Sequence, residues 1–67
     1  MDVKVIRENL RKQPFQSFSM RLVDGREYFV KHPDSAAVSP RTVVVIDAET
    51  EAVTVLELML IISLEGL

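Results

Sequence analysis

Residues 18–31 constrain the fold more than any other part of this chain. They contain two stretches in which apolar residues occupy alternate positions, and Asp24 and Gly25 lie between these stretches. The pattern predicts a β-hairpin, because alternation is typical of strands with one buried face and glycine accepts the positive φ of tight turns. We therefore expect the core of this chain to be built on a sheet.

The register of the hairpin depends on the length of its loop. A loop of two residues places Met20 opposite Phe29 and divides the apolar side chains poorly between the two faces. A loop of three residues, 23–25, puts Gly25 in a left-handed conformation and places Met20 opposite Tyr28 on one apolar face. We expect the second register.

Length and composition bound the function classes. The chain has 67 residues, which is one domain with a small core. It has no cysteine, so neither disulfides nor thiolate zinc sites can stabilise it. Hydrophobic residues make up 48% of the chain, which favours burial of some apolar surface between subunits. The formal net charge of -2, without a basic run, argues against a nucleic-acid surface built on bulk charge.

A short helix is expected over about residues 2–12. Asp2 is a suitable N-cap, Val3, Ile6 and Leu10 recur at helical spacing, and Pro14 ends the segment. Because so short a helix is marginal in water, its apolar residues are expected to pack on the sheet.

Further strands are predicted beyond the hairpin strands, which cover about residues 17–23 and 26–31. Pro33 closes the hairpin, and residues 36–40 are expected to form a loop or a short irregular strand. The strand at about 41–46 is apolar on both faces and should be central or covered on each side. Another strand is expected at about 51–56.

The C-terminal segment has two interpretations. Thr54 and Glu57 have the spacing of a capping box, which allows a terminal helix. A helix there would be apolar nearly all round, so we favour a strand at about 60–65 after a tight turn. The segment 53–64 is interrupted by polar residues and falls short of the roughly 20 apolar residues of a membrane span.

The expected fold class is mostly β (α+β). One domain, 1–67, would hold a short N-terminal helix followed by a strongly bent sheet of four or five antiparallel strands, or a small barrel. The first residues mix charges where a signal peptide needs an apolar region, so a cytoplasmic location is expected.

The hairpin contains the pattern Leu22-x-Asp24-Gly25-Arg26-x-Tyr28-x-Val30-x-His32-Pro33. In this pattern it resembles a group of small uncharacterised bacterial proteins. More distantly, the order of a helix, this hairpin, a valine-rich strand and a closing apolar strand resembles the Sm-like fold, which includes the bacterial RNA chaperone Hfq. The resemblance implies a small Sm/SH3-like barrel. It also implies rings in which the fourth strand of one subunit joins the fifth strand of the next.

Several positions depart from the Sm-like pattern. Val30 stands where a small residue usually lets the second strand bend, and residues 36–38 lack a base-stacking side chain. Residues 56–58 carry Glu57 where the family presents basic residues, and a carboxylate repels phosphate. No RNA-binding residue is therefore carried over.

No catalytic or metal constellation is expected. His32, the only histidine, is followed by Asp34 and Ser35, but neighbours on one turn rarely align as a triad. The acids at Asp34, Asp47, Glu49 and Glu51 lack the spacing of a calcium loop and are interpreted as solvated turn residues. We expect no enzyme activity, no metal and no cofactor.

The candidate contacts for a partner or a nucleic acid are Arg21, Phe29, Lys31 and His32. The basic residues are expected to be ordinary surface charges paired with neighbouring acids. Phe29 lies on the polar face of the hairpin, where it is either a stacking platform or covered by the N-terminal helix. We expect the helix to cover it.

Self-association is the favoured function class. The expected protein is a homo-oligomeric interaction or scaffold module, and the alternative is an RNA- or single-stranded nucleic-acid-binding module. The candidate oligomer interface consists of the apolar residues near the C-terminus, Val53, Val55, Leu58, Leu60 and Ile62.

Overall fold

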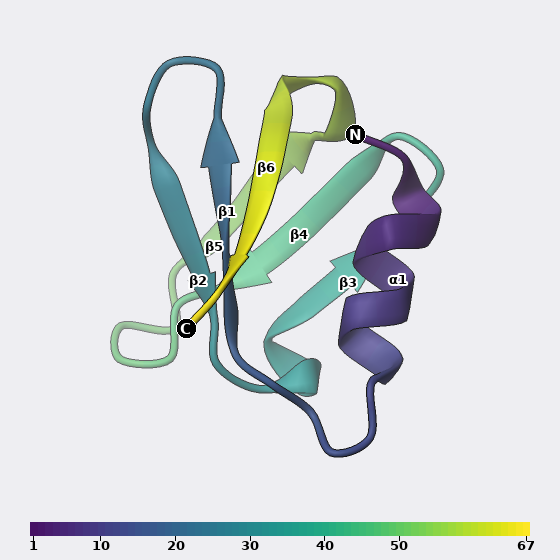
Figure 1. Ribbon diagram of the computed structural model, residues 1–67. Helices are drawn as coiled ribbons and strands as arrows, with labels where there is room; N and C mark the ends of the chain where they lie inside the picture. Colours follow the sequence, from purple (N-terminus) through teal and green to yellow (C-terminus); the bar gives the residue numbers. More distant parts are fainter.

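The chain forms one short helix and six strands in two antiparallel sheets (Figure 1). The computed structural model describes all residues, 1–67. The elements are α1 (Val3–Arg11), β1 (Phe18–Leu22), β2 (Glu27–Val30), β3 (Ala36–Val38), β4 (Thr42–Ile46), β5 (Val53–Glu57) and β6 (Ile61–Gly66), with 3-10 turns at Pro33–Ser35 and Leu58–Leu60.

The two sheets face each other across the core. One has the strand order β2-β1-β6 and the other β3-β4-β5, and no strand of one sheet is hydrogen-bonded to a strand of the other. The expectation of a mostly β, α+β fold is confirmed, but six strands replace the expected four or five and the ladder does not close into a barrel. The ladder is open at two places: a 3-10 turn that starts with proline, Pro33–Ser35, separates β2 from β3, and β5 does not pair with β6.

The hairpin has the expected register. Phe18 pairs with Val30 and Met20 with Tyr28. The loop is closed by the N–H of Gly25, which donates to the carbonyl of Leu22 over 3.0 Å. Gly25 has a φ of 91°, so the prediction of a left-handed glycine is confirmed.

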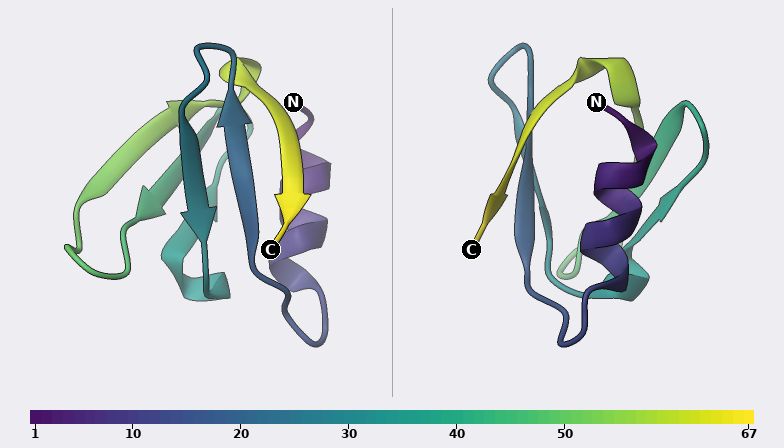
Figure 2. Two further views of the ribbon diagram at one scale, coloured as in Figure 1. Left: turned by 60° about the vertical axis from the view of Figure 1, so that its left-hand side comes forward. Right: turned by 45° about the vertical axis from the view of Figure 1, so that its right-hand side comes forward.

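Helix α1 begins and packs as its sequence predicts. The side chain of Asp2 accepts a hydrogen bond of 2.9 Å from the N–H of Lys4. Ile6 is fully buried, while Val3 and Leu10 are partly buried against the same core. The helix lies beside β3, on the side of the molecule away from the β1–β2 hairpin (Figure 2).

The C-terminal segment is a strand, which decides between the two interpretations of its sequence. The 3-10 turn Leu58–Leu60 leads into β6, which pairs antiparallel with β1. Thr54 lies inside β5 and caps no helix. The backbone hydrogen bonds to β1 therefore outweigh the helix-forming tendency of this leucine-rich segment.

Strand β4 is central, as expected, but only one of its faces is covered. Val43 and Val45 are buried, whereas Val44 is half-buried and Ile46 is exposed. The neighbouring segment Ala36–Val38, expected to be a loop or an irregular strand, forms β3 and pairs with β4.

The core draws its side chains from both sheets and from the helix. Its ten buried apolar residues are Ile6, Phe18, Met20, Leu22, Val30, Val43, Val45, Leu56, Leu58 and Ile61. Helix α1 lacks the length and the apolar character that a membrane-crossing helix needs.

Replacement of Gly25 tests the turn. Gly25→Val should lower the free energy of unfolding by about 1 kcal/mol or more, because a β-branched residue is strained at this positive φ. Gly66→Val is the matched control, since a side chain at either glycine would meet open space and only Gly25 has a positive φ. Urea unfolding of both variants measures the difference. Equal losses would contradict the role assigned to the turn.

Truncation of Ile6 tests the packing of the helix. Ile6→Ala should cost about 2 kcal/mol or more, because it leaves a cavity between the sheets. Val5→Ala truncates a side chain of the same helix that is 41% exposed and should change stability by no more than about 0.5 kcal/mol. Thermal unfolding measures the stability of both variants. Equal losses of stability in Ile6→Ala and Val5→Ala would contradict the packing role of Ile6.

Candidate functional site

A groove lies between the free edge of β2 and the connection from β4 to β5. It holds about 450 Å³ and is lined on the hairpin side by Glu27, Tyr28, Phe29 and Lys31. Helix α1 and β2 lie on opposite sides of the molecule, so the helix leaves this groove uncovered (Figure 1). We call it the edge groove.

The second wall of the edge groove comes from the β4–β5 connection. The residues that form it are Val45, Ile46, Asp47, Ala48, Glu49, Ala52 and Thr54, and Ser35 closes one end. Val45 is buried in the core, whereas the acids of the turn are exposed. The groove therefore has an apolar floor and an acidic rim.

Phe29 is exposed over 49% of its surface in this groove. The expectation that the N-terminal helix covers Phe29 is wrong, because α1 packs beside β3, on the far side of the sandwich. Tyr28, the next residue along β2, points to the opposite face of the strand and is half-buried. Strand β2 thus presents one aromatic side chain on each of its two faces.

Asp47 organises the turn that carries the acidic rim. Its carboxylate accepts hydrogen bonds from the N–H groups of Glu49 (2.8 Å) and Thr50 (3.0 Å). Its own carbonyl accepts from the N–H of Glu51 over 2.9 Å, and Glu51 takes a φ of 61°. These bonds close a short local loop, in which the side chain of aspartate imitates a backbone turn.

Those hydrogen bonds also favour the ionised form of the Asp47 carboxyl. The backbone N–H groups of Thr50 and Glu49 hold the pKa of this carboxyl below its ordinary value, and the charge of Lys31 acts in the same direction. Asp47 is exposed in a turn, as its sequence context indicates, but its hydrogen bonds to the turn backbone were not expected. The signal that could have revealed them is an aspartate followed by polar residues, which is typical of a side-chain-capped turn.

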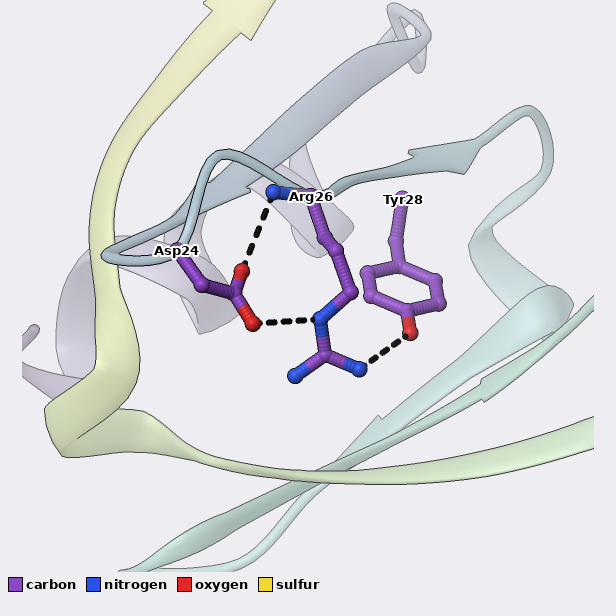
Figure 3. A network of polar contacts seen from close by, with 3 residues as sticks. All are labelled: Asp24, Arg26 and Tyr28. Carbon is purple, nitrogen blue, oxygen red and sulfur yellow. Dashed lines mark hydrogen bonds and ion pairs between the residues drawn. The ribbon is translucent and has the colours of Figure 1, made fainter.

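Arg26 joins the hairpin turn to Tyr28 (Figure 3). Its Nε donates to Asp24 over 2.7 Å, and its guanidinium also donates to the hydroxyl of Tyr28 over 3.1 Å. The guanidinium carbon lies 5.9 Å from the centre of the Tyr28 ring. The backbone N–H of Arg26 donates to Asp24 as well, and this bond is the main reason that the pKa of Asp24 is lowered. Arg26 thereby fixes the tyrosine that lines the groove.

The two arginines of the hairpin are paired with acids, whereas Lys31 forms no ion pair. Arg21 forms an ion pair of 3.0 Å with Glu27, and Arg26 forms one of 2.7 Å with Asp24. The interpretation of these two arginines as ordinary paired surface charges is confirmed. Both pairs are well exposed to solvent, so each contributes little to stability.

His32 and Lys31 follow the end of β2 and are exposed. The carbonyl of His32 accepts hydrogen bonds from the Ser35 hydroxyl (2.7 Å) and from the Ser35 N–H (3.1 Å). Ser35 therefore bonds the backbone of His32 and not its imidazole. The structure contains no group of three or more His, Cys, Asp or Glu side chains able to hold a metal ion.

The candidate interface residues divide into two sets. Val53, Val55 and Ile62 are exposed over 63%, 64% and 56% of their surfaces. Leu58 is buried in the core of its own chain, so it is withdrawn from the interface that the sequence predicted, and Leu60 is half-buried against that core. The difference arises at the 3-10 turn, which directs Leu58 inward.

The comparisons with known proteins found no family model that matches this sequence, and no match among curated proteins or solved structures.

Acidification tests the hydrogen bonds of Asp47. Because its pKa is lower in the folded chain than in the unfolded chain, the unfolded chain binds more protons below about pH 4. The stabilisation is complete above that pH and is lost as the pH falls through the lower, folded pKa. Asp47→Asn keeps an acceptor oxygen but does not titrate, so its stability should fall less on acidification than that of the natural protein.

Asp47→Ala is the companion variant, because it removes the acceptor as well and should be less stable than Asp47→Asn at neutral pH. Urea unfolding at a series of pH values measures both effects. The same acid sensitivity in Asp47→Asn and in the natural protein would show that the Asp47 carboxylate plays no part.

Proposed function

We propose that this protein is a homo-oligomeric interaction or scaffold module without catalytic activity. The observation that carries the proposal is strand β5, which is an edge strand of its sheet and also bears two valines that are nearly two-thirds exposed. An exposed, apolar edge strand favours pairing with a strand of another chain.

The backbone of β5 supports this proposal. The N–H of Asp47 donates to the carbonyl of Ala52, so residues 52, 54 and 56 direct their backbone groups toward β4. The backbone groups of Val53 and Val55 consequently point away from the sheet. Their side chains lie beside Ile46 and Val44 on the outer face of β4, so the outer face adjoining this edge is apolar.

Strand β6 offers the complementary edge. It pairs only with β1 and carries Ile62 at a point where the β1–β6 register shifts. If β2 and β3 are two halves of one interrupted strand, β5 is the fourth strand of the chain and β6 the fifth. We propose that neighbouring subunits join through these two edges, in an Sm-like arrangement.

The alternative, a module that binds RNA or single-stranded nucleic acid, has weaker support. Exposed Phe29 beside Lys31 is compatible with base stacking. Arg21 and Arg26 are already paired with carboxylates, and Glu49 on the opposite wall of the groove would repel phosphate. Salt-dependent binding of single-stranded RNA would favour this alternative.

Charge insertion at the two edges tests the oligomer. Val55→Lys and Ile62→Lys should each reduce the mass measured by light scattering toward that of one chain, because a lysine would be buried at the subunit contact. The natural protein should have a mass larger than one chain across the micromolar range.

The matched control is Val23→Lys, which charges a similarly exposed valine of the hairpin loop that belongs to neither β5 nor β6. It should leave the oligomeric mass unchanged. A natural protein that is folded by circular dichroism and has the mass of one chain at all these concentrations would contradict the proposal.

A further inference from the structure

The edge groove runs along backbone groups that no other strand uses. The N–H of Leu22 donates to the carbonyl of Arg26 over 2.8 Å, and hydrogen-bonded pairs alternate along an antiparallel ladder. Tyr28 and Val30 therefore direct their backbone groups toward β1, whereas Glu27 and Phe29 direct theirs away from it. Strand β2 has no partner on that second side.

The wall of the groove opposite β2 is a turn held by its own hydrogen bonds. The hydrogen bonds within the Asp47 turn hold the β4–β5 connection in one local conformation across from β2. The space between the walls, about 450 Å³, lies within the range of small ligand sites. Phe29 and Ile46, both exposed, supply apolar contacts from the two walls. The groove thus combines unpaired backbone groups with apolar contacts for side chains.

The charges along the groove select the occupant. Its lining contains three carboxylates, of Glu27, Asp47 and Glu49, and a single cation, Lys31. The ion pairs of the structure engage Glu27 and Asp24, and the Asp47 carboxylate accepts backbone hydrogen bonds. The carboxylate of Glu49 remains without an ion-pair partner at the rim. This arrangement attracts a cationic side chain and disfavours an anionic one.

We propose that the edge groove binds an extended peptide segment that carries lysine or arginine, by addition of a strand to β2. The peptide backbone bonds Glu27 and Phe29, its apolar side chains contact Phe29 and Ile46, and its basic side chain reaches Glu49. The backbone edge of β2 that the peptide would bond belongs to neither edge of the proposed oligomer, so either proposal can fail without the other.

A peptide of about seven residues that alternates valine and lysine is the probe, since this length matches one short strand. Titration into isotope-labelled protein should shift the amide resonances of Phe29 and Glu49 in the NMR spectrum. The same peptide methylated on the nitrogens that face β2 should bind about tenfold more weakly, because it lacks those hydrogen bonds. A peptide with glutamate in place of lysine should produce no shifts at these amides.

Two pairs of protein variants complete the test. Glu49→Lys should lower the affinity for the lysine peptide about fivefold or more. Glu8→Lys makes the same charge change on the exposed face of α1 and should lower that affinity about twofold or less. Phe29→Ser should weaken binding, and Val23→Ser, which alters an exposed valine outside the groove, should not.

Each of the following results would overturn the proposal. The first is equal binding of the methylated and unmethylated peptides, which would exclude strand addition. The second is an equal effect of Glu49→Lys and Glu8→Lys, which would show that the net charge of the protein, and not the groove, attracts the peptide. The third is a map of shifted amides confined to β5 and β6, or shifts at Phe29 and Glu49 produced by a single-stranded oligonucleotide instead of the basic peptide.

Discussion

Side-chain packing between two sheets is the interaction on which the rest of this structure depends. The sheets share no strand pairing, so they are held face to face by the apolar residues between them and by the chain that links them. Helix α1, whose Ile6 belongs to this core, lies on one side of the sandwich (Figure 2). The chain has no second helix for the other side, where β2 and the β4–β5 connection remain apart. The position of the edge groove is therefore a consequence of how this small core is closed.

The unpaired strand edges follow from the same limit. A domain of this length cannot cover every edge: helix α1 lies beside β3, and β2, β5 and β6 each keep one side without a neighbouring strand or helix contact of that kind. The edges differ in chemistry, because β5 bears exposed valines and β2 faces an acidic rim. Apolar edges favour stable association with another apolar surface, whereas a charged groove favours a partner that binds transiently. Two kinds of association can thus coexist on one small chain.

Local sequence patterns predicted most of the elements but not how they come together. The register of the hairpin and the buried position of Ile6 follow from alternation, glycine and helical spacing, all of which act over a few residues. Strand β3 was uncertain because two alanines give a weak strand signal, and its pairing with β4 supplies what its own residues lack. The exposure of Phe29 and the burial of Leu58 depend on where α1 and the 3-10 turn lie. The edge groove likewise joins residues about twenty positions apart, and no short pattern marks it.

Local pairing of charges decides the character of the groove more than the net charge does. The chain has 8 basic and 10 acidic residues, a near balance that by itself predicts no preference for a partner. Arg21 is held by an acid of the neighbouring strand and Arg26 by an acid of the turn, which removes both arginines as contacts for an anion. The turn of Asp47 presents Glu49 at the rim without a compensating cation. An anionic ligand would have to displace these pairs or approach that carboxylate, whereas a cationic segment meets three carboxylates and one cation, Lys31.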